Sequence, residues 1–347
     1  MTGTCFVLGA GFSVPAELPP QETLLRSPPP EIADIVGKIF NIDPEKHYDE
    51  IEKIPLEDIF TFLDRININH ELIPDTDIDF AFAYNAKRII LNHIINVFNS
   101  KLAAMHETEA YYHFFDQIVR RRIAGESNTV ITLNWDTIPE YYIYKSYKNH
   151  NIYKAGVDYA CYDFDYDDNS RYVQSILRKA KGFSTIKVLK LHGSINWLHS
   201  NALGYLRVKE QTGAAPSGLV ARASEQREME NILITPTLLK NIENTHLKMI
   251  WFNAGIDLLE ARRVVFLGYS LALADFDFRY LLLKSICRRK DVKLRVLLYP
   301  ENASAEKLYK RNQTEARYRN FFIGNNIQYK YMNVKDFMQN DKLIWNW

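Results

Sequence analysis

The sequence predicts an α/β fold built on a doubly wound, mostly parallel β-sheet. Short apolar runs alternate with segments of helical length, and this alternation is typical of parallel sheets. Most runs lack the polar–apolar alternation of a half-exposed strand, which indicates strands covered by helices on both faces. The predicted strands are Cys5–Leu8, Thr129–Leu133, Ile186–Leu191, Ile232–Ile234, Arg263–Leu267, Val292–Tyr299 and Ile327–Met332.

Three segments depart from this plan. The last predicted strand alternates apolar with polar residues, so we expect it at an edge of the sheet. Residues 31–123 carry apolar residues at helical spacing, such as Ile90 and Ile94, and predict a helical insertion. Residues 200–231 contain scattered Gly and Pro and predict a loop or lid. We therefore expect one domain over residues 1–347 that contains both insertions.

The composition is that of a globular protein without a strong overall charge. The 347 residues are 47% apolar and 24% charged, an ordinary balance for a protein with a buried core. The 43 basic and 42 acidic side chains nearly cancel, so we do not expect nucleic acid as a direct substrate. No apolar stretch reaches membrane-spanning length and no cleavable leader is evident, so we expect a cytoplasmic protein.

The cysteines argue against a structural metal site. Only Cys5, Cys161 and Cys287 occur, and no two of them form a Cys-x-x-Cys pair. A zinc site with four thiolates needs one cysteine more than the chain has. We therefore expect no metal and no disulfide framework.

A glycine-rich turn follows the first predicted strand. The run Gly9-Ala10-Gly11-Phe12-Ser13 allows a backbone to approach a diphosphate, which N–H groups at a helix start can bind. By itself such a run is often only a tight turn. Val14 stands where the dehydrogenase fingerprint has its third glycine, and no strand-ending acid follows about twenty residues later. The turn therefore favours a dinucleotide but argues against an ordinary Rossmann dehydrogenase.

Small or polar residues stand at the ends of further predicted strands. They are Asn134 and Asp136 after the second strand, His192 and Gly193 after the third, and Gly268 and Ser270 after the fifth. In an open parallel sheet, ligands bind beyond the carboxyl ends of the strands. Each residue taken alone has a structural alternative: Asn134 or Asp136 can cap a helix, and His192 can be a core histidine. Only the set as a whole favours a ligand site.

Together these motifs resemble those of the sirtuins and follow the sirtuin order. The phrases Leu133-Asn134-Trp135-Asp136 and Leu191-His192-Gly193-Ser194 are closer to the bacterial sirtuin-like NAD hydrolases of anti-phage defence. Glu57-Asp58-Ile59-Phe60 and residues 235–241 are similar to phrases of the same branch. The resemblance covers nearly the whole chain, least specifically in the helical insertion. It implies a sirtuin-like, Rossmann-like fold and NAD as the substrate.

The resemblance also implies roles for the strand-end residues. Asn134 would bind ribose or position a water, and His192 would accept a proton from a ribose hydroxyl or from the attacking water. Asp136 would bind the carboxamide or stabilise developing positive charge. The remaining NAD-binding residues would hold the diphosphate and the adenosine ribose; they are Gly9, Ala10, Gly11, Phe12, Ser13, Gly193, Gly268, Ser270, Glu301 and Asn302.

Two departures from deacylating sirtuins bear on the reaction. Their zinc ribbon needs four cysteines, which this chain lacks, and their peptide groove lies beside that module. Without that groove, water is the expected acceptor, and NAD would be hydrolysed to nicotinamide and ADP-ribose. Transfer of ADP-ribose or an acyl group to a protein is the alternative. A non-catalytic sensor of NAD or ADP-ribose is the third hypothesis.

The resemblance extends to assembly. Stand-alone relatives in two-gene defence systems pair with a HerA-type ring ATPase, and almost nothing follows the last predicted strand that could form a sensor domain. The chain is rich in aromatic residues, with 21 Tyr and 19 Phe. We therefore expect a homo-oligomer, with a HerA-type ATPase as the candidate partner. A monomer whose aromatic residues fill a large core is the alternative.

Overall fold

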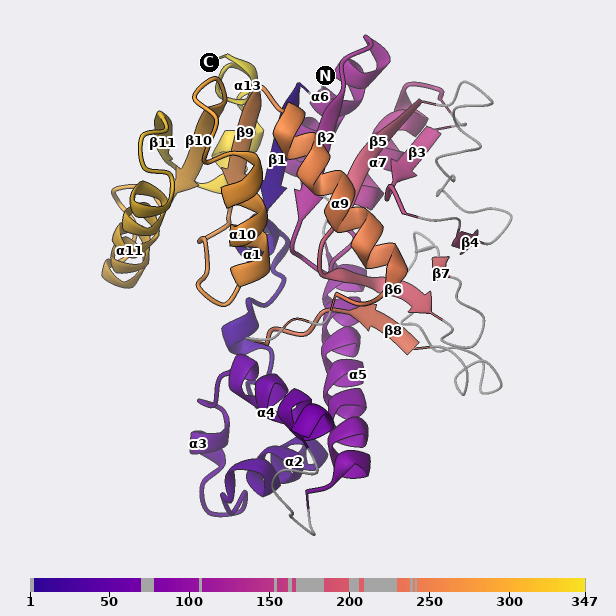
Figure 1. The fold of residues 1–347 in the computed structure, drawn as a ribbon, viewed down its shortest axis with the longest axis vertical. Helices are drawn as coiled ribbons and strands as arrows, with labels where there is room; N and C mark the ends of the chain where they lie inside the picture. The colour runs from indigo at the N-terminus through magenta and orange to yellow at the C-terminus, as the bar shows by residue number, and fades with distance from the viewer. Residues whose placement is uncertain are drawn as a thin grey trace.

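A parallel sheet of seven strands forms the centre of the protein, in the order β11-β10-β9-β1-β2-β5-β3 (Figure 1). The computed structural model describes residues 3–69, 78–105, 108–152, 155–161, 164–166, 184–199, 206–208, 230–237, 240 and 242–346. The strands of this sheet are β1 (Thr4–Leu8), β2 (Asn128–Thr132), β3 (Ala155–Asp158), β5 (Ser184–Lys190), β9 (Arg263–Leu267), β10 (Lys293–Leu298) and β11 (Ile327–Tyr331). Neighbouring strands pair in parallel throughout. The predicted doubly wound parallel fold is confirmed.

One predicted strand belongs to a different sheet. The run Ile232–Ile234 corresponds to β8, which pairs antiparallel with β6 in a second, four-stranded sheet ordered β4-β7-β6-β8. The strands of that sheet are β4 (Phe164–Tyr166), β6 (Gly193–His199), β7 (Leu206–Val208) and β8 (Glu230–Leu233). The expectation of a parallel strand is wrong here because Gly193, with φ of 77°, turns the chain after β5 and creates an antiparallel partner. The last predicted strand, β11, lies at the sheet edge as its alternation predicts.

The order of the strands reverses beside β1. Strand β1 pairs with β2 on one side and with β9 on the other. From β2 the sheet grows outward through β5 to β3, and from β9 it grows through β10 to β11. The carboxyl ends of β1 and β9 therefore flank the topological switch point, where open α/β sheets bind their ligands.

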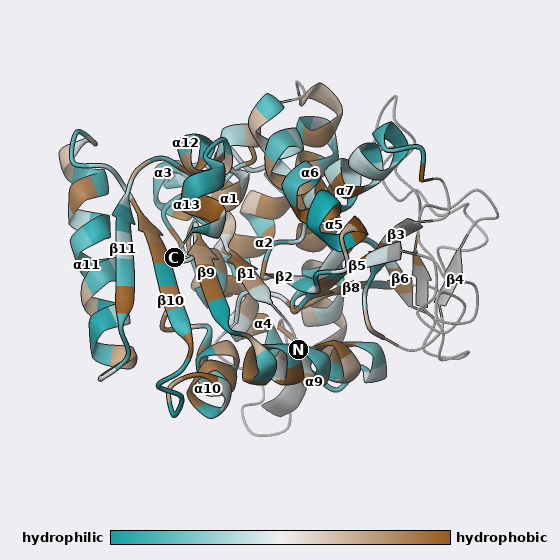
Figure 2. Ribbon diagram, turned by 90° about the horizontal axis from the view of Figure 1, so that it is seen from above, coloured by the Kyte–Doolittle hydropathy of each residue, from teal (hydrophilic) through white to brown (hydrophobic). Residues whose placement is uncertain are grey.

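Helices cover both faces of the parallel sheet (Figure 2). One face carries α6 (Glu109–Ile123), α7 (Ile138–Asn149), α12 (Val334–Met338) and α13 (Asp341–Trp345), and the other carries α9 (Thr245–Glu260) and α10 (Phe276–Ser285). Helix α11 (Ala305–Phe321) packs against β10 near the β11 edge. Because both faces are covered, all residues of β1 and β2 are buried.

The helices of residues 31–123 divide into two sets. The first set packs together beyond the carboxyl ends of the strands and is called the helical lobe (Figure 1). It consists of α2 (Pro30–Phe40), α3 (Tyr48–Ile51), α4 (Leu56–Asn69) and α5 (Phe80–Ala104). Helix α6 instead packs on α7 and β5. The short helix α1 (Ala10–Ser13) and two 3₁₀ turns, Val14–Ala16 and Gln21–Thr23, lead from β1 to the lobe.

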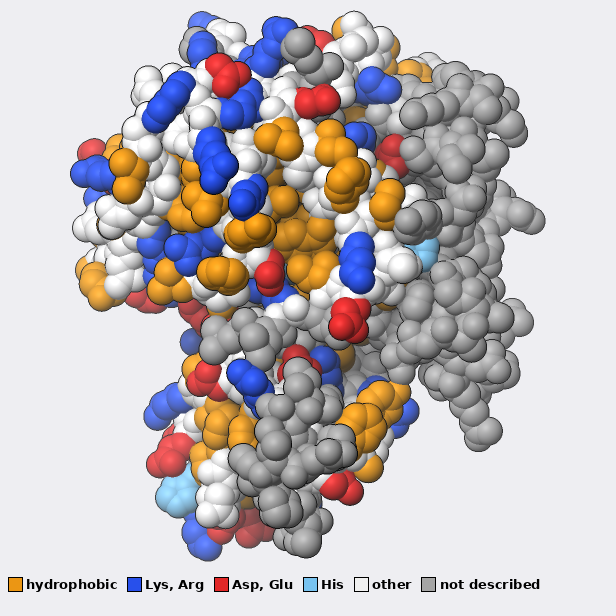
Figure 3. Space-filling model, in the orientation of Figure 1, with side chains coloured by type: hydrophobic (Ala, Val, Ile, Leu, Met, Phe, Trp, Pro, Cys, Tyr) orange, Lys and Arg blue, Asp and Glu red, His pale blue; other side chains and the backbone are white. Residues whose placement is uncertain are grey.

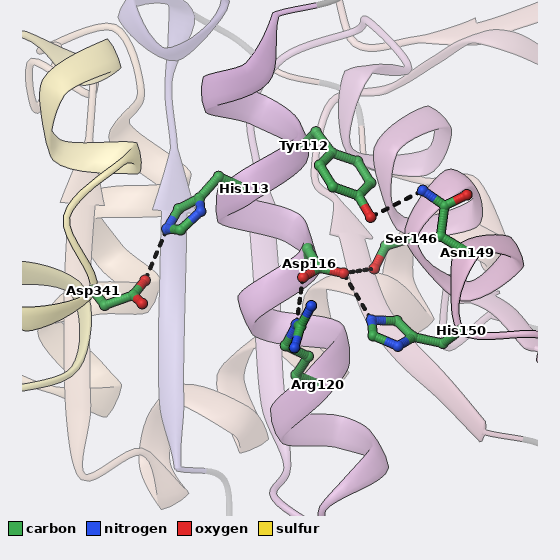
Figure 4. A network of polar contacts seen from close by, with 8 residues as sticks. All are labelled: Tyr112, His113, Asp116, Arg120, Ser146, Asn149, His150 and Asp341. Carbon is green, nitrogen blue, oxygen red and sulfur yellow. Dashed lines mark hydrogen bonds and ion pairs between the residues drawn. The ribbon is translucent and has the colours of Figure 1, made fainter.

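A polar cluster joins α6 to α7 (Figure 4). Asp116 accepts hydrogen bonds from Ser146 Oγ at 2.7 Å and from Arg120 Nε at 2.5 Å, and it lies 2.8 Å from His150 Nε2. Burial favours a higher pKa for Asp116, but the hydrogen bonds from Ser146, Arg120 and His150 outweigh it and lower that pKa. None of these residues lines the cleft described below. The contacts of Asp116 with Ser146 and His150 tie α6 to α7.

The face formed by α9 and α10 exposes apolar side chains (Figure 3). Phe252 and Leu259 of α9 and Phe276 and Tyr280 of α10 are each more than half exposed. Both helices also have buried residues; α9 packs against β5, and α10 packs against α9. Among the described residues, no helix combines the length and the apolar character needed to cross a bilayer.

Candidate active site

A cleft of about 420 Å³ lies between the carboxyl edge of the parallel sheet and the helical lobe. Its strand-end wall follows β1, β2, β5 and β9 and consists of Gly9, Ala10, Ser13, Asn134, Trp135, Asp136, His192, Gly268, Tyr269 and Ser270. Its lobe wall consists of Leu18, Pro19, Pro20, Gln21, Glu22, Leu24, Pro55, Leu56, Glu57 and Phe98. The remaining lining residues are Leu133, Ile234, Pro236, Lys240, Ala272 and Asp275. The volume suits a ligand of cofactor size.

The turn after β1 packs directly against the turn after β9. The N–H of Gly9 donates to the Leu267 carbonyl at 3.0 Å, and that of Gly11 donates to the Gly268 carbonyl at 2.9 Å. Gly268 has φ of 64°, and a Cβ there would lie 2.1 Å from the amide nitrogen of Phe12. These glycines therefore allow two backbones to touch. The amides of Gly9 and Gly11 are both bonded to protein. Of the glycine-rich run, Gly9, Ala10 and Ser13 line the cleft.

Asn134 links the turn after β1 to the turn after β2. Its Nδ2 donates to the Gly9 carbonyl and to Ser13 Oγ, both at 2.9 Å. Ser13 Oγ donates to Asp136 Oδ2 at 2.7 Å, and Asp136 Oδ1 accepts from the Ile138 N–H at 3.0 Å. Asp136 is only 2% exposed. Its carboxylate therefore holds Ser13 and the start of α7, and the three predicted residues form one polar chain.

A buried ion pair, Lys190 with Glu140, holds the backbone at Asp136 in this polar chain of side chains. Lys190 is fully buried; its Nζ donates to the backbone carbonyl of Asp136 and lies 3.1 Å from Glu140 Oε1. The Tyr159 hydroxyl donates to the same Glu140 oxygen at 3.1 Å. Burial raises the pKa of Glu140, and the Lys190 charge opposes that rise. Removing either partner would leave an uncompensated buried charge, which is strongly destabilising. Because Lys190 also donates to the Asp136 carbonyl, the pair fixes the turn after β2.

His192 places its ring in the cleft between β5 and β6. Its side chain is 12% exposed, and Nε2 lies 3.8 Å from Asp275 Oδ1. This Nε2 is buried and has no hydrogen-bond partner among the described residues. Burial lowers the pKa of His192 to about 4; the Asp275 charge opposes this shift and the Lys240 charge adds to it. The imidazole is therefore neutral at neutral pH, the state in which it can accept a proton.

The sequence assigned no role to Lys240 and Asp275, which the structure places in the cleft. Lys240 Nζ donates to Asp275 Oδ1 and to the Ala274 carbonyl, both at 2.9 Å. Lys240 follows β8 in a segment without helical or strand periodicity, so its position could not be predicted. Asp275 stands at the N-cap position of α10, and an aspartate there is ordinarily interpreted as a helix cap. The available signal was its closeness to the Gly268–Leu271 motif.

Eight of the predicted residues meet in the cleft, and five do not. Phe12 is 1% exposed and packs its ring against Tyr111 and Phe115, so its side chain is part of the core. Glu301 and Asn302 are exposed after β10. The predicted residues outside the cleft lining are Gly11, Phe12, Gly193, Glu301 and Asn302. Contact of the last two with adenosine stays a prediction.

The lobe wall is mainly apolar. Phe98 of α5 reaches across to Trp135, with ring centroids 6.3 Å apart in an edge-to-face arrangement. Glu57, in the first turn of α4, and Glu22 are its charged residues. The predicted loop or lid over residues 200–231 lies mostly outside the described residues.

No metal site is evident within the described part of the chain. Among these residues, no group of three or more His, Cys, Asp and Glu side chains is arranged to hold an ion. Cys5 is buried, and its Sγ donates to the Asp257 carbonyl at 3.5 Å. The expectation that the protein holds no zinc stays a prediction.

Comparison with known proteins identifies the family. A family model described as a SIR2-like domain matches residues 128–323, which is more than half of the chain. The chain belongs to the SIR2-like family. The matched region contains Asn134, Asp136, His192, Gly268 and Ser270. No curated protein matches the chain.

Solved sirtuin structures align over nearly the whole SIR2-like chain at low identity. One is a crystal structure of SIR2 with the inhibitor EX-527, 2'-O-acetyl-ADP-ribose and a deacetylated p53 peptide. It is 12% identical with a TM-score of 0.43, and the alignment covers 97% of this chain and 91% of that one. The other is Sir2Tm bound to a propionylated peptide, 13% identical with a TM-score of 0.38, covering 97% and 90%. The assignment of residues to the site therefore rests on this chain's own geometry.

Proposed function

We propose that this SIR2-like protein hydrolyses NAD to nicotinamide and ADP-ribose. The observation that carries the proposal is the meeting of His192 and Asn134 in one cleft at the switch point of the sheet. A buried, neutral imidazole with an unpartnered Nε2 suits a general base. Family membership supports NAD as the substrate, because SIR2-like domains are associated with NAD-dependent chemistry.

In the proposed reaction, water replaces nicotinamide on the anomeric carbon of the ribose. The bond from that carbon to the pyridinium nitrogen breaks with its electron pair going to nitrogen, so nicotinamide leaves as a neutral molecule. The oxygen of water forms the new bond and loses one proton, which His192 accepts and passes to solvent. The cleavage has oxocarbenium character, as in glycoside hydrolysis. No acid is needed for the leaving group.

The remaining strand-end residues would bind and orient the substrate. Ala10 and the Gly9 turn lie at the switch point, where a diphosphate fits the close approach of the backbone. Asn134 is held by Gly9 and Ser13, so its amide is fixed before substrate arrives. Such preorganised dipoles stabilise developing charge without reorganisation during the reaction.

Transfer to a protein is the second candidate reaction, and binding without turnover is the third. Incubating the purified protein with NAD and separating the products by chromatography distinguishes them. Nicotinamide and free ADP-ribose in equal amounts are expected. Nicotinamide with ADP-ribosylated protein would favour transfer, and intact NAD would favour a sensor.

We further propose that NAD depletion serves anti-phage defence and that the protein works as a homo-oligomer with a HerA-type ATPase. The support is the resemblance of the motif phrases to that branch of the family. Light scattering during size exclusion tests the assembly, and a single monomer mass at micromolar concentration would reject it. A higher mass would leave the partner open, and co-purification from the native host would then identify it.

A further inference from the structure

Asp275 occupies the N-cap position of α10 but does not cap the helix. The side chain at this position makes no capping hydrogen bond to the first turn. Its Oδ1 instead accepts from Lys240 Nζ at 2.9 Å and lies 3.8 Å from His192 Nε2. An N-cap hydrogen bond normally stabilises the start of a helix. The carboxylate is therefore directed toward the cleft at the expense of a cap.

We propose that Lys240 and Asp275 form a positioning pair that keeps the imidazole of His192 neutral and ready to accept a proton. One carboxylate oxygen is shared between an ammonium group and an imidazole nitrogen. The Lys240 side chain is 2% exposed and that of Asp275 is 16% exposed, so water and salt screen this interaction only weakly. This inference rests on the proposed function, in which His192 is the base.

The two members of the pair act on His192 in opposite directions. The Asp275 carboxylate by itself would favour the imidazolium ion, and the His192 base would then be protonated before substrate binds. The Lys240 charge offsets this attraction, and burial lowers the pKa of His192 further, to about 4. When His192 accepts a proton during turnover, Asp275 is the anion that stabilises the imidazolium. The pair thus allows a neutral resting state and a stabilised protonated state.

Other charged and titratable groups face the same cleft from the surrounding elements. Tyr269 stays protonated, because burial first and then the Asp275 charge raise its pKa well above the ordinary value. Asp136 is bonded to Ser13. Glu57 and Glu22 approach from the lobe wall. Among the described residues that line the cleft, Lys240 is the only lysine or arginine. Removing its charge should therefore change the pKa of His192 most.

A purely structural ion pair, which would only tie the segment after β8 to the start of α10, is the competing explanation. The two explanations differ in whether Lys240 affects proton binding by His192. The pKa of the His192 imidazole can be measured by NMR titration of histidine-labelled protein without any substrate. This readout stays valid even if the wild-type protein releases no nicotinamide, so failure of the proposed function and failure of this inference are distinguishable.

Removing the Lys240 charge should raise the pKa of His192. We expect K240M to raise it by about one to two pH units, the size typical of an unbalanced carboxylate at this range. K240R should restore the wild-type value, and the double variant K240M/D275N should return close to it because both charges are gone. In the pH profile of nicotinamide release, the acid limb of K240M should lie at higher pH than that of the wild type. The rate of K240M should recover at alkaline pH.

The matched control is the Lys187–Asp257 pair, a second buried-carboxylate ion pair with a separation of 2.8 Å that does not line the cleft. K187M should leave the His192 titration unchanged. A folded K240M protein whose His192 titrates as in the wild type would overturn the inference. If K240M does not fold, K240Q retains a donor for Asp275 and the Ala274 carbonyl without the charge, and the same two outcomes apply to it.

Discussion

The two walls of the cleft differ in how their residues are held. On the strand-end wall, polar groups and glycines are fixed by hydrogen bonds between neighbouring strand ends, as Asn134 is by Gly9 and Ser13. The lobe wall presents mainly proline, leucine and phenylalanine side chains, among them Leu56 and Phe98. A wall of oriented dipoles suits chemistry, and an apolar wall suits ligand contact and exclusion of water. Substitutions on the first should change turnover, and those on the second should change affinity.

Gly268→Ala is expected to have the largest effect. The new Cβ would lie 2.1 Å from the Phe12 amide nitrogen at φ of 64°, so the ends of β1 and β9 would have to separate. We expect a loss of about 3 kcal/mol or more in unfolding free energy, measured by urea denaturation, together with loss of activity. Gly125→Ala is the control, because φ is 91° there but nothing lies within 4 Å of the new Cβ. It should lose only about 1–2 kcal/mol, and equal losses would refute the close contact.

Asn134→Ala should lower turnover by about 100-fold or more while the protein stays folded. The amide is a preorganised dipole in the strand-end wall, and removing such a group typically has this effect. Steady-state rates of nicotinamide release give kcat and KM separately. Asn149→Ala removes a hydrogen bond to the Tyr112 hydroxyl; neither residue lines the cleft, so both constants should stay unchanged. If Asn134→Ala changes KM alone, Asn134 binds substrate without a catalytic role.

The buried neutral state of His192 should make stability depend on pH. Burial lowers the pKa of His192 to about 4, below the ordinary 6.5. Its contribution to the free energy of unfolding is therefore complete above pH 6.5. That contribution is lost as pH falls toward 4, because the unfolded state then binds a proton that the folded state does not. The free energy of unfolding should fall by about 2.5 kcal/mol between pH 7.5 and pH 4.5. Urea denaturation at both values should show a smaller difference for His192→Gln. His113→Gln, which removes a half-exposed pair with Asp341, is the comparison. Identical differences for wild type and His192→Gln would contradict the buried neutral ring.

Phe98→Leu on the lobe wall is expected to have the smallest effect. The substitution keeps an apolar side chain but removes the edge-to-face contact with Trp135. We expect KM to rise by up to about tenfold, which corresponds to up to about 1.4 kcal/mol of lost contact energy, with kcat little changed. Phe62→Leu is the control on the same lobe, since Phe62 is exposed and does not line the cleft. A large loss of kcat in Phe98→Leu would remove the distinction between the walls.

The sequence predicted the strand-end wall better than the lobe wall for a physical reason. Residues such as Asn134 and His192 directly follow apolar strands, and parallel strands bring their carboxyl ends to one edge. Strand position alone therefore predicts that they meet. The prediction that Ile232–Ile234 pairs in parallel was wrong. The direction of pairing depends on the turn at Gly193, and a short apolar run does not reveal that turn.

Contacts made by isolated side chains were beyond prediction. Lys240 has no periodic neighbours, and its partner Asp275 is interpreted from sequence as an ordinary N-cap. Phe98 lies on a helix whose apolar face predicts burial but not which wall it joins. The glycine-rich run places Phe12 among the predicted NAD-binding residues but does not reveal that its side chain packs in the core with Tyr111. In each case the deciding information is a tertiary contact between segments distant in sequence.

His192→Ala tests most directly whether the strand-end wall cleaves NAD. Two quantities are measured on the same protein: equilibrium binding of NAD by calorimetry and the rate of nicotinamide release by chromatography. We expect binding close to that of the wild type and turnover reduced by about 10²–10⁴-fold, the usual contribution of a general base. Turnover above about a tenth of the wild-type rate would contradict the assignment of His192 as the base.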